Sequence, residues 1–172
     1  MEVDLLPEYV EDIKKNKVTL VKNFSKIEKE YDFNLLMSLF EKTDVPVTTK
    51  NNGADDFFKT VFQIKKLENT FEDFKFVQGF LKQVFKYLPH NEDSCDIFFS
   101  FKSGSGLSHV DEEDVFIIGL NGVAVYKIFG EKTDYLEIHK GDLIYIPKGI
   151  RHKVIGLSPR ITLSVGFFGA KI

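Results

Sequence analysis

The second half of the chain consists of short apolar runs that end at glycine-rich turns, and this pattern most limits what the chain can fold into. Five runs are expected to form strands: 96–101, 115–120, 123–129, 143–146 and 161–167. Turn signals lie between them, and Asn121-Gly122 between two apolar runs is typical of a tight hairpin. Many short strands joined by tight turns predict a mainly β fold, either a sandwich or a barrel closed on itself.

The first half of the chain, residues 1 to about 90, carries mostly helical patterns. Helices are expected over 7–15, 33–40 and 71–88, and a short strand over 18–21. Residues 45–49 are expected to be extended, with a turn at 51–53. Because no low-complexity linker separates the halves, residues 1–172 are expected to form one domain, with the helices of 1–90 packed outside a barrel formed by 91–172.

Composition and charge are those of an ordinary globular protein: of 172 residues, 43% are hydrophobic and 28% charged, with a net charge of -3. The small negative charge predicts neither nucleic acid nor an anionic membrane as a partner. A single cysteine, Cys95, excludes an intrachain disulfide and a cysteine-based zinc site. The acidic start and the lack of about 18 consecutive apolar residues argue against a signal peptide and a membrane span. The cytoplasm is therefore the expected location.

Two segments carry residues that can bind a metal. His109 and Asp111 are two residues apart, so on a strand both side chains would point to the same face. His152 ends a Gly-x5-Pro-x-Gly-x2-His string that begins at Gly141, and this string is the more specific of the two signals. Two histidines and one carboxylate fill three positions of an octahedron and leave three open, which suits a catalytic site better than a structural one.

Other possible ligands are assigned to the surface. Glu112 and Glu113 break the two-residue spacing of a strand face and are expected to face solvent. His90 follows a proline in an expected loop, and His139 precedes an expected turn. The sequence therefore predicts one metal site, formed by His109, Asp111 and His152.

Both segments resemble the two sequence motifs of the cupin superfamily, although Gly156 stands where many cupins have Asn. Asp111 in place of a second histidine, and Val115 in place of a Glu ligand, resemble the JmjC-like branch, particularly the cupin-like hydroxylases of ribosomal proteins. The stretch from His109 to Gly122 and the closing Ser164-Val-Gly-Phe are similar to theirs, within a resemblance that covers residues 95 to 168.

The resemblance implies a double-stranded β-helix of the cupin or jelly-roll type. It also implies an oxygenase that uses Fe(II), 2-oxoglutarate and O2, and releases succinate and CO2 with the hydroxylated product. His109, Asp111 and His152 would be its metal ligands and catalytic residues.

The expected anchor for 2-oxoglutarate is missing from its usual place. In the resembled family a Lys or Arg after the Asn-Gly turn pairs with the far carboxylate, and Ala124 stands there. Arg160 resembles the arginine of prolyl-hydroxylase-like oxygenases, and its planar fork suits a carboxylate. The alternative is that Arg160 is a solvated residue beside the turn at Pro159. Lys127 is a weaker replacement, because strand parity points it away from the face of Ala124.

Three further residues are expected to line the cosubstrate pocket. Thr162 and Ser164 share the strand face of Arg160, and Tyr126 shares the face of Ala124. The apolar walls, or simply the core, are expected to contain Phe98, Phe116 and Ile118.

The leading hypothesis is an Fe(II)- and 2-oxoglutarate-dependent dioxygenase that hydroxylates a peptide, a protein side chain or a small metabolite. Ala124 favours instead a metal-dependent cupin without 2-oxoglutarate, such as an isomerase or another dioxygenase. A non-catalytic cupin that binds a small molecule is the third hypothesis, and the complete triad argues against it. The habit of cupins suggests a homodimer, and no motif identifies the substrate or the stereochemistry.

Overall fold

The computed structural model describes residues 7–28, 30–42, 47–49, 60–65, 90–102 and 105–169. The helix expected over 71–88 and the turn expected at 51–53 lie outside these residues.

Two helices lie in the described part of the chain, and both were predicted to within a few residues. α1 (Pro7–Lys14) begins at a proline, whose fixed φ suits the first helical turn. It ends before Asn16, which adopts a left-handed φ of 53°. α2 (Phe33–Lys42) is capped by Asp32, whose Oδ1 accepts a hydrogen bond of 2.8 Å from the backbone N–H of Leu35.

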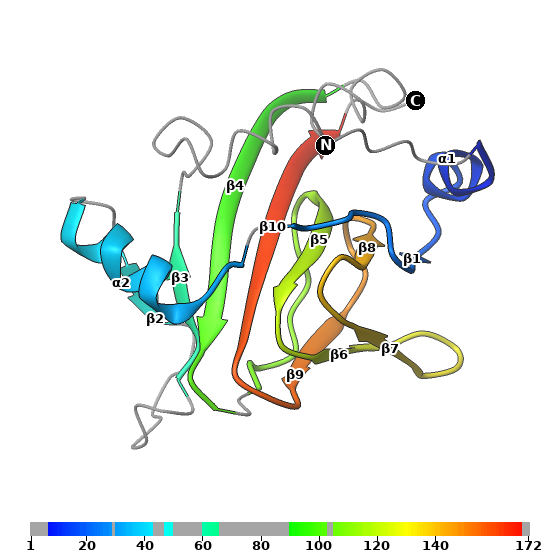
Figure 1. The fold of residues 1–172 in the computed structure, drawn as a ribbon. Helices are drawn as coiled ribbons and strands as arrows, with labels where there is room; N and C mark the ends of the chain where they lie inside the picture. Colours follow the sequence, from blue (N-terminus) through cyan, green and yellow to red (C-terminus); the bar gives the residue numbers. More distant parts are fainter. Residues whose placement is uncertain are drawn as a thin grey trace.

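The described strands form two antiparallel sheets (Figure 1). The larger has the order β1-β8-β5-β10-β4-β3-β2, and the smaller has the order β7-β6-β9. The strands are β1 (Thr19–Val21), β2 (Val47–Thr49), β3 (Phe62–Ile64), β4 (His90–Ser100), β5 (Asp114–Asn121), β6 (Ala124–Ile128), β7 (Asp134–Ile138), β8 (Leu143–Ile146), β9 (His152–Gly156) and β10 (Arg160–Gly169).

The Asn-Gly turn does not form the predicted hairpin. β5 pairs with β8 and β10, whereas β6 pairs with β7 and β9, so Asn121-Gly122 carries the chain from one sheet to the other. Gly122 has a φ of 70°, and a Cβ there would collide with the carbonyl oxygen of Pro159. The turn thus connects β5 in the larger sheet with β6 in the smaller sheet, and this connection links the two sheets of the barrel.

Strand alternation separates two apolar layers. Phe116 and Ile118 of β5 point away from the barrel, into a layer that also contains Ile13 of α1 and Leu36 of α2. Val115 and Ile117 alternate with these two residues and point inward, to the apolar layer between the sheets. The predicted mainly β barrel with helices outside is therefore confirmed, and Figure 1 shows the two helices near opposite ends of the larger sheet.

One other expectation about the strands was wrong, and three strands were not predicted. His90 is part of β4 and not of a loop, because its backbone pairs with Gly169 at the far end of β10. The three strands that were not predicted are β3, β7 and β9. In β7 most residues are exposed, and its sequence has little apolar alternation.

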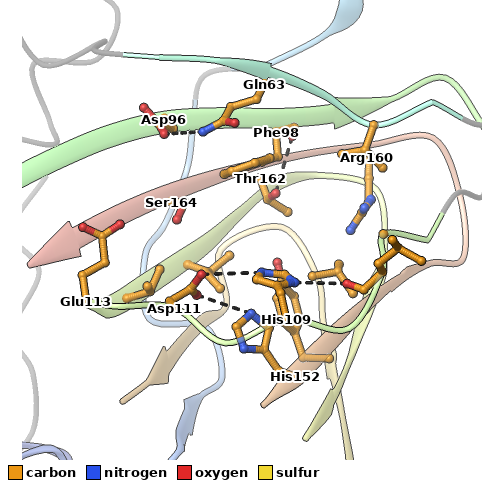
Figure 2. Close-up of a pocket in the computed structure, with 17 residues that line it drawn as sticks. Gln63, Asp96, Phe98, His109, Asp111, Glu113, His152, Arg160, Thr162 and Ser164 are labelled. Carbon is orange, nitrogen blue, oxygen red and sulfur yellow. Dashed lines mark hydrogen bonds and ion pairs between the residues drawn. The ribbon is translucent and has the colours of Figure 1, made fainter. Parts of the chain in front are cut away.

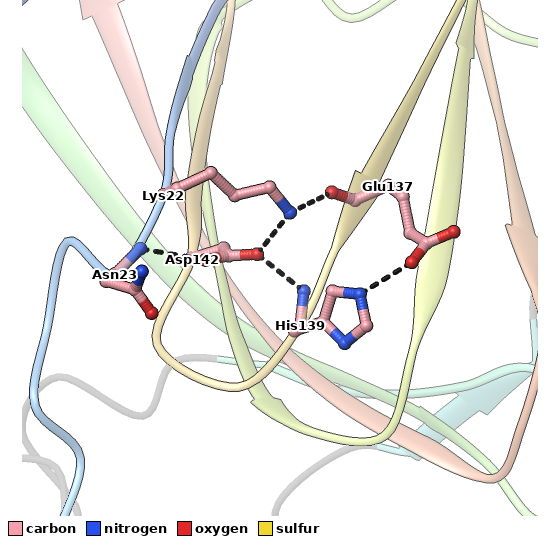
Figure 3. A network of polar contacts seen from close by, with 5 residues as sticks. All are labelled: Lys22, Asn23, Glu137, His139 and Asp142. Atoms are coloured by element: carbon pink, nitrogen blue, oxygen red, sulfur yellow. Dashed lines mark hydrogen bonds and ion pairs between the residues drawn. The ribbon is translucent and has the colours of Figure 1, made fainter.

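A buried carboxylate fastens the N-terminal segment to the barrel (Figure 3). Asp142, 2% exposed, accepts hydrogen bonds from Lys22 Nζ at 2.7 Å and from the backbone N–H groups of Asn23 and His139 at 2.9 Å each. Lys22 Nζ also donates to the carbonyl oxygen of Glu137. Burial alone would raise the pKa of Asp142, but these hydrogen bonds lower it overall.

Candidate metal centre and its cavity

His109 and His152 come together through backbone pairing. The backbone N–H of each donates to the carbonyl oxygen of the other at 2.9 Å, and the ring centroids are 4.4 Å apart. His152 begins β9, whereas His109 forms only an isolated bridge. Asp111 lies just before the bend at Glu112 and Glu113 and not on a strand as predicted, and its carbonyl oxygen accepts a hydrogen bond from Gly149 N.

The three side chains converge on one point. The Nε2 atoms of His109 and His152 lie 3.6 and 3.5 Å from the two carboxylate oxygens of Asp111, and the three possible ligand atoms all lie within 4.8 Å of one another. Ligands that share a metal at bonds of about 2.1 Å lie about 3 Å apart in an octahedron, so a small contraction suffices to bind an ion.

The hydrogen bonds of the imidazoles select the tautomer that binds a metal. Nδ1 of His109 lies 3.1 Å from the carbonyl oxygen of Leu107, and Nδ1 of His152 lies 3.1 Å from that of Ile150. Because a carbonyl oxygen only accepts, each Nδ1 must carry the hydrogen, and each Nε2 then presents its lone pair toward Asp111. Two lone pairs facing a carboxylate are donors that could hold a divalent cation.

Burial favours the neutral form of His152, which is 2% exposed. Desolvation lowers its pKa, and neighbouring His109 lowers it further, while the Ile150 carbonyl and the Asp111 carboxylate act in the opposite direction. His109 is more exposed, so the site has a closed side and an open side.

The triad opens into a cavity of about 320 Å³ between the sheets, within the range of small-molecule sites. Arg160 lines one end of the cavity and is 3% exposed. Its guanidinium points into the cavity in Figure 2, and Nε donates a long hydrogen bond of 3.5 Å to Ser100 Oγ. Among the described residues, no carboxylate lies within ion-pair distance of Arg160. Burial lowers its pKa, against the opposing influence of Tyr126.

The other expected cosubstrate residues line the same cavity. Thr162 and Ser164 project from β10 on the face of Arg160, and Tyr126 projects from β6. Burial raises the pKa of the Tyr126 hydroxyl, although Arg160 and a hydrogen bond with Thr162 act in the opposite direction. The alternative of a solvated Arg160 is wrong, since this residue is buried.

Glu113 does not face solvent as predicted. Its side chain lines the cavity, and its pKa is raised by burial first and then by the neighbouring carboxylates Asp111 and Asp96. Glu112 is exposed, as expected. Sequence reasoning also missed Asp96 and Gln63, whose side chains share a hydrogen bond of 2.6 Å in the cavity wall. The alternation of Asp96 with Phe98 on β4 was the available signal for Asp96.

The remaining candidates lie outside the site. His139 is exposed and pairs with Glu137 at 2.6 Å. Lys127 Nζ lies over the rings of Phe129 and Tyr135, at 4.8 and 5.6 Å from their centroids, which agrees with the outward parity expected for it. Phe98 does line the cavity, whereas Phe116 and Ile118 belong to the outer apolar layer and form no wall of it.

Known structures share this architecture. The model of the JmjC domain family matches residues 123–172. A structure of YcfD, a ribosomal oxygenase from Escherichia coli, superposes on 99% of this chain with a TM-score of 0.78 and 19% sequence identity. The chain has a JmjC-like cupin fold. Another YcfD structure, in complex with cobalt and 2-oxoglutarate, gives a TM-score of 0.77 at 18% identity and again covers 99% of this chain.

The chain spans only about half the length of those structures, since 54% of each YcfD chain is covered. No curated protein has a sequence that matches it significantly. In the part of the chain that the structure describes, no helix is long and apolar enough to cross a membrane.

Proposed function

We propose that this protein is an Fe(II)- and 2-oxoglutarate-dependent oxygenase. The observation that carries the proposal is one cavity that contains both a His-Asp-His set and, at one end, a buried arginine without a carboxylate partner among the described residues. The similarity to YcfD, an oxygenase for which a complex with cobalt and 2-oxoglutarate is known, supports the same conclusion.

The metal would be held by Nε2 of His109, Nε2 of His152 and the carboxylate of Asp111. Three positions of an octahedron then remain for cosubstrate and oxygen. When bound, the iron supplies the activation of O2 that is coupled to decarboxylation of 2-oxoglutarate. The carbonyl oxygens of Leu107 and Ile150 keep each Nε2 free for the metal.

Arg160 would bind the far carboxylate of 2-oxoglutarate through two parallel hydrogen bonds. Its burial would strengthen that interaction, because charges attract more strongly in a poorly solvated environment. The hydroxyl groups of Tyr126, Thr162 and Ser164 line the same cavity and would donate or accept further hydrogen bonds. These residues would together anchor the far carboxylate of 2-oxoglutarate. The methyl group of Ala124 cannot bind a carboxylate.

The partners in the reaction are proposed to be 2-oxoglutarate, O2 and a substrate that is a peptide, a protein side chain or a small metabolite. Residues 1–172 are proposed to act as one cupin-like domain, since side chains of α1 and α2 contribute to the outer apolar layer of the barrel. A cytoplasmic location, a homodimer and the absence of a nucleic-acid partner stay predictions from the sequence.

A metal-dependent cupin reaction without 2-oxoglutarate is the second candidate, and Ala124 is the observation that favours it. Succinate formation separates the two. We expect the protein with Fe(II), 2-oxoglutarate and O2 to form succinate, and a His109→Ala, His152→Ala double variant to lose both metal binding and succinate formation. His139→Ala, which removes an exposed histidine, is the matched control and should keep both. Metal binding without any succinate from the wild type would contradict the proposal in favour of the second candidate.

A further inference from the structure

The turn between β8 and β9 leads directly to His152 of the candidate metal centre. It consists of Pro147, Lys148, Gly149 and Ile150, and the backbone N–H of Ile150 donates to the carbonyl oxygen of Pro147 at 3.2 Å. Gly149, with a φ of 83°, occupies the third position, where one class of turn favours glycine. This hydrogen bond closes the turn, but the N–H groups of the two central residues must find acceptors outside it.

Both of these N–H groups donate to the segment that contains Asp111. The glycine N–H donates to the carbonyl oxygen of Asp111 at 3.1 Å, and the lysine N–H donates to Oδ1 of Asp114 at 2.7 Å. At the end of the same turn, the carbonyl oxygen of Ile150 lies 3.1 Å from Nδ1 of His152. The turn therefore contacts two of the three expected metal ligands, the backbone of one and the imidazole of the other.

Asp114 holds this turn from the outer face of the larger sheet. It is the first residue of β5, and its side chain shares the outward parity of Phe116. Tyr145, which is 1% exposed and lies in the outer apolar layer, forms a side-chain hydrogen bond with Asp114. Burial, and then the Asp114 carboxylate, raises the pKa of Tyr145, so the hydroxyl stays protonated and donates. The carboxylate is thus held between the Tyr145 hydroxyl and the Lys148 amide.

The backbone around Asp111 depends on this contact because it belongs to no strand. Residues 110–113 lie between the isolated bridge at His109 and the start of β5. The N–H of Gly149 fixes the Asp111 carbonyl there in place of a sheet ladder. Metal ligands must be held to within about 0.5 Å of their working geometry. Anchoring Lys148 also anchors the N–H of Gly149, since the two residues are joined by one planar peptide.

We propose that Asp114 is a positioning residue of the metal centre, which fixes Asp111 and His152 relative to each other by anchoring the turn 147–150. The inference rests on the proposed function for the identity of the metal ligands. Asp114 acts through the backbone of the turn and not by contact with the ion, because its side chain lies on the outer face of β5.

The test measures Co(II) binding to the full chain by calorimetry and by visible absorption. Asp114→Ala removes the acceptor, and should weaken Co(II) binding about tenfold and change the Co(II) spectrum, because partners that orient metal ligands contribute on this scale. Asp114→Asn removes the same charge, but its amide oxygen still accepts from Lys148 and its NH2 group can donate to Tyr145. This variant should stay within about threefold of the wild-type affinity.

Asp142→Ala is the matched control, because Asp142 also accepts from two backbone N–H groups, but at the N-terminal segment. It should lower stability and leave the Co(II) affinity and spectrum unchanged. Equal losses of affinity in Asp142→Ala and Asp114→Ala would contradict the inference, since general destabilisation would then be responsible. Asp114→Asn that binds Co(II) as weakly as Asp114→Ala would also contradict it, because charge alone would explain the loss.

Amide hydrogen exchange of the metal-free chain gives a second measurement. We expect the Gly149 amide to exchange about tenfold faster in Asp114→Ala than in the wild type, and near the wild-type rate in Asp142→Ala. Unchanged exchange in Asp114→Ala would overturn the inference, because the turn would stay in place without the carboxylate. Failure of the proposed function looks different: the wild type would bind no Co(II), while the Gly149 amide would still respond to Asp114→Ala.

Tyr145→Phe keeps the test decisive if Asp114→Ala does not fold. It leaves the ring in the apolar layer and removes only the hydroxyl that holds the Asp114 carboxylate. We expect a severalfold loss of Co(II) affinity and faster exchange at Gly149. Wild-type values for both would show that the carboxylate needs no such support, and the inference would be wrong.

Discussion

At the scale of single residues, Arg160 combines deep burial with no carboxylate partner among the described residues, so its buried charge destabilises the fold. We expect Arg160→Met, which keeps the length and removes the charge, to raise the free energy of unfolding by about 1–3 kcal/mol without ligands. The same change should weaken 2-oxoglutarate binding at least tenfold, because a charged hydrogen-bonding partner is lost. Urea denaturation and calorimetric titration measure the two effects.

Arg151→Met provides the comparison for this prediction, because Arg151 is exposed and contacts Ser108 Oγ at 3.5 Å outside the Arg160 end of the cavity. It should change neither stability nor cosubstrate affinity appreciably. An Arg160→Met variant that bound 2-oxoglutarate with wild-type affinity would show that another group anchors the far carboxylate.

At the scale of elements, the attachment of β1 to β8 depends on the hydrogen bonds of Asp142. Asp142→Asn places an amide N–H against a group that donates, so we expect the free energy of unfolding at neutral pH to fall by about 1–3 kcal/mol. The folded state holds the pKa of Asp142 below its usual value. Its contribution is therefore complete above the unfolded pKa of about 3.9 and is lost as the pH falls through the lower folded pKa.

Denaturation at a series of pH values checks both parts of the Asp142 prediction, since the difference between wild type and Asp142→Asn should vanish in strong acid. Asp134→Asn, an exposed carboxylate on β7, should change stability by less than about 0.5 kcal/mol. Equal losses in the two variants would mean that surface charge and not the buried network is responsible.

Elements were predicted best where pattern and burial agree. The run 143–146 matches β8 at both ends, because its alternate residues fill the two apolar layers on either side of the sheet. The Asn-Gly turn was assigned to the wrong kind of connection, since its glycine fits a tight turn in a hairpin and a tight turn between sheets equally well. Local sequence specifies the bend and leaves the pairing of the flanking strands open.

At the scale of the whole molecule, residues of both sheets line one cavity. Under the proposed function this cavity binds metal and cosubstrate, so ligand binding should stabilise the fold. We expect Co(II) to raise the melting temperature, and 2-oxoglutarate to raise it further only when metal is present, since its keto acid would bind through the ion. At a concentration a hundredfold above the dissociation constant, each ligand should contribute about 2.7 kcal/mol, or roughly 5–10 °C.

Thermal denaturation with and without a chelator measures these shifts. The His109→Ala, His152→Ala double variant should show neither. A shift with 2-oxoglutarate alone that equals the shift with metal present would contradict a cosubstrate site built around the ion.

The sequence by itself determined which side chains share a face. Because alternation along a strand is a local property of the backbone, the inward direction of Arg160, Thr162 and Ser164 followed from their spacing. The spacing around His109, Asp111 and His152 likewise identified the three residues that the structure brings within 4.8 Å. Their role as metal ligands stays a prediction.

Only the tertiary structure decided what meets across the cavity. Glu113 lies more than fifty positions from Gly166 in the chain, and its carboxyl group reaches the inner face of β10 because β5 and β10 are neighbours in the sheet. Gln63 meets Asp96 for the same reason, through the pairing of β3 with β4. Strand order depends on long-range pairing of backbones, which residue spacing within one strand does not encode.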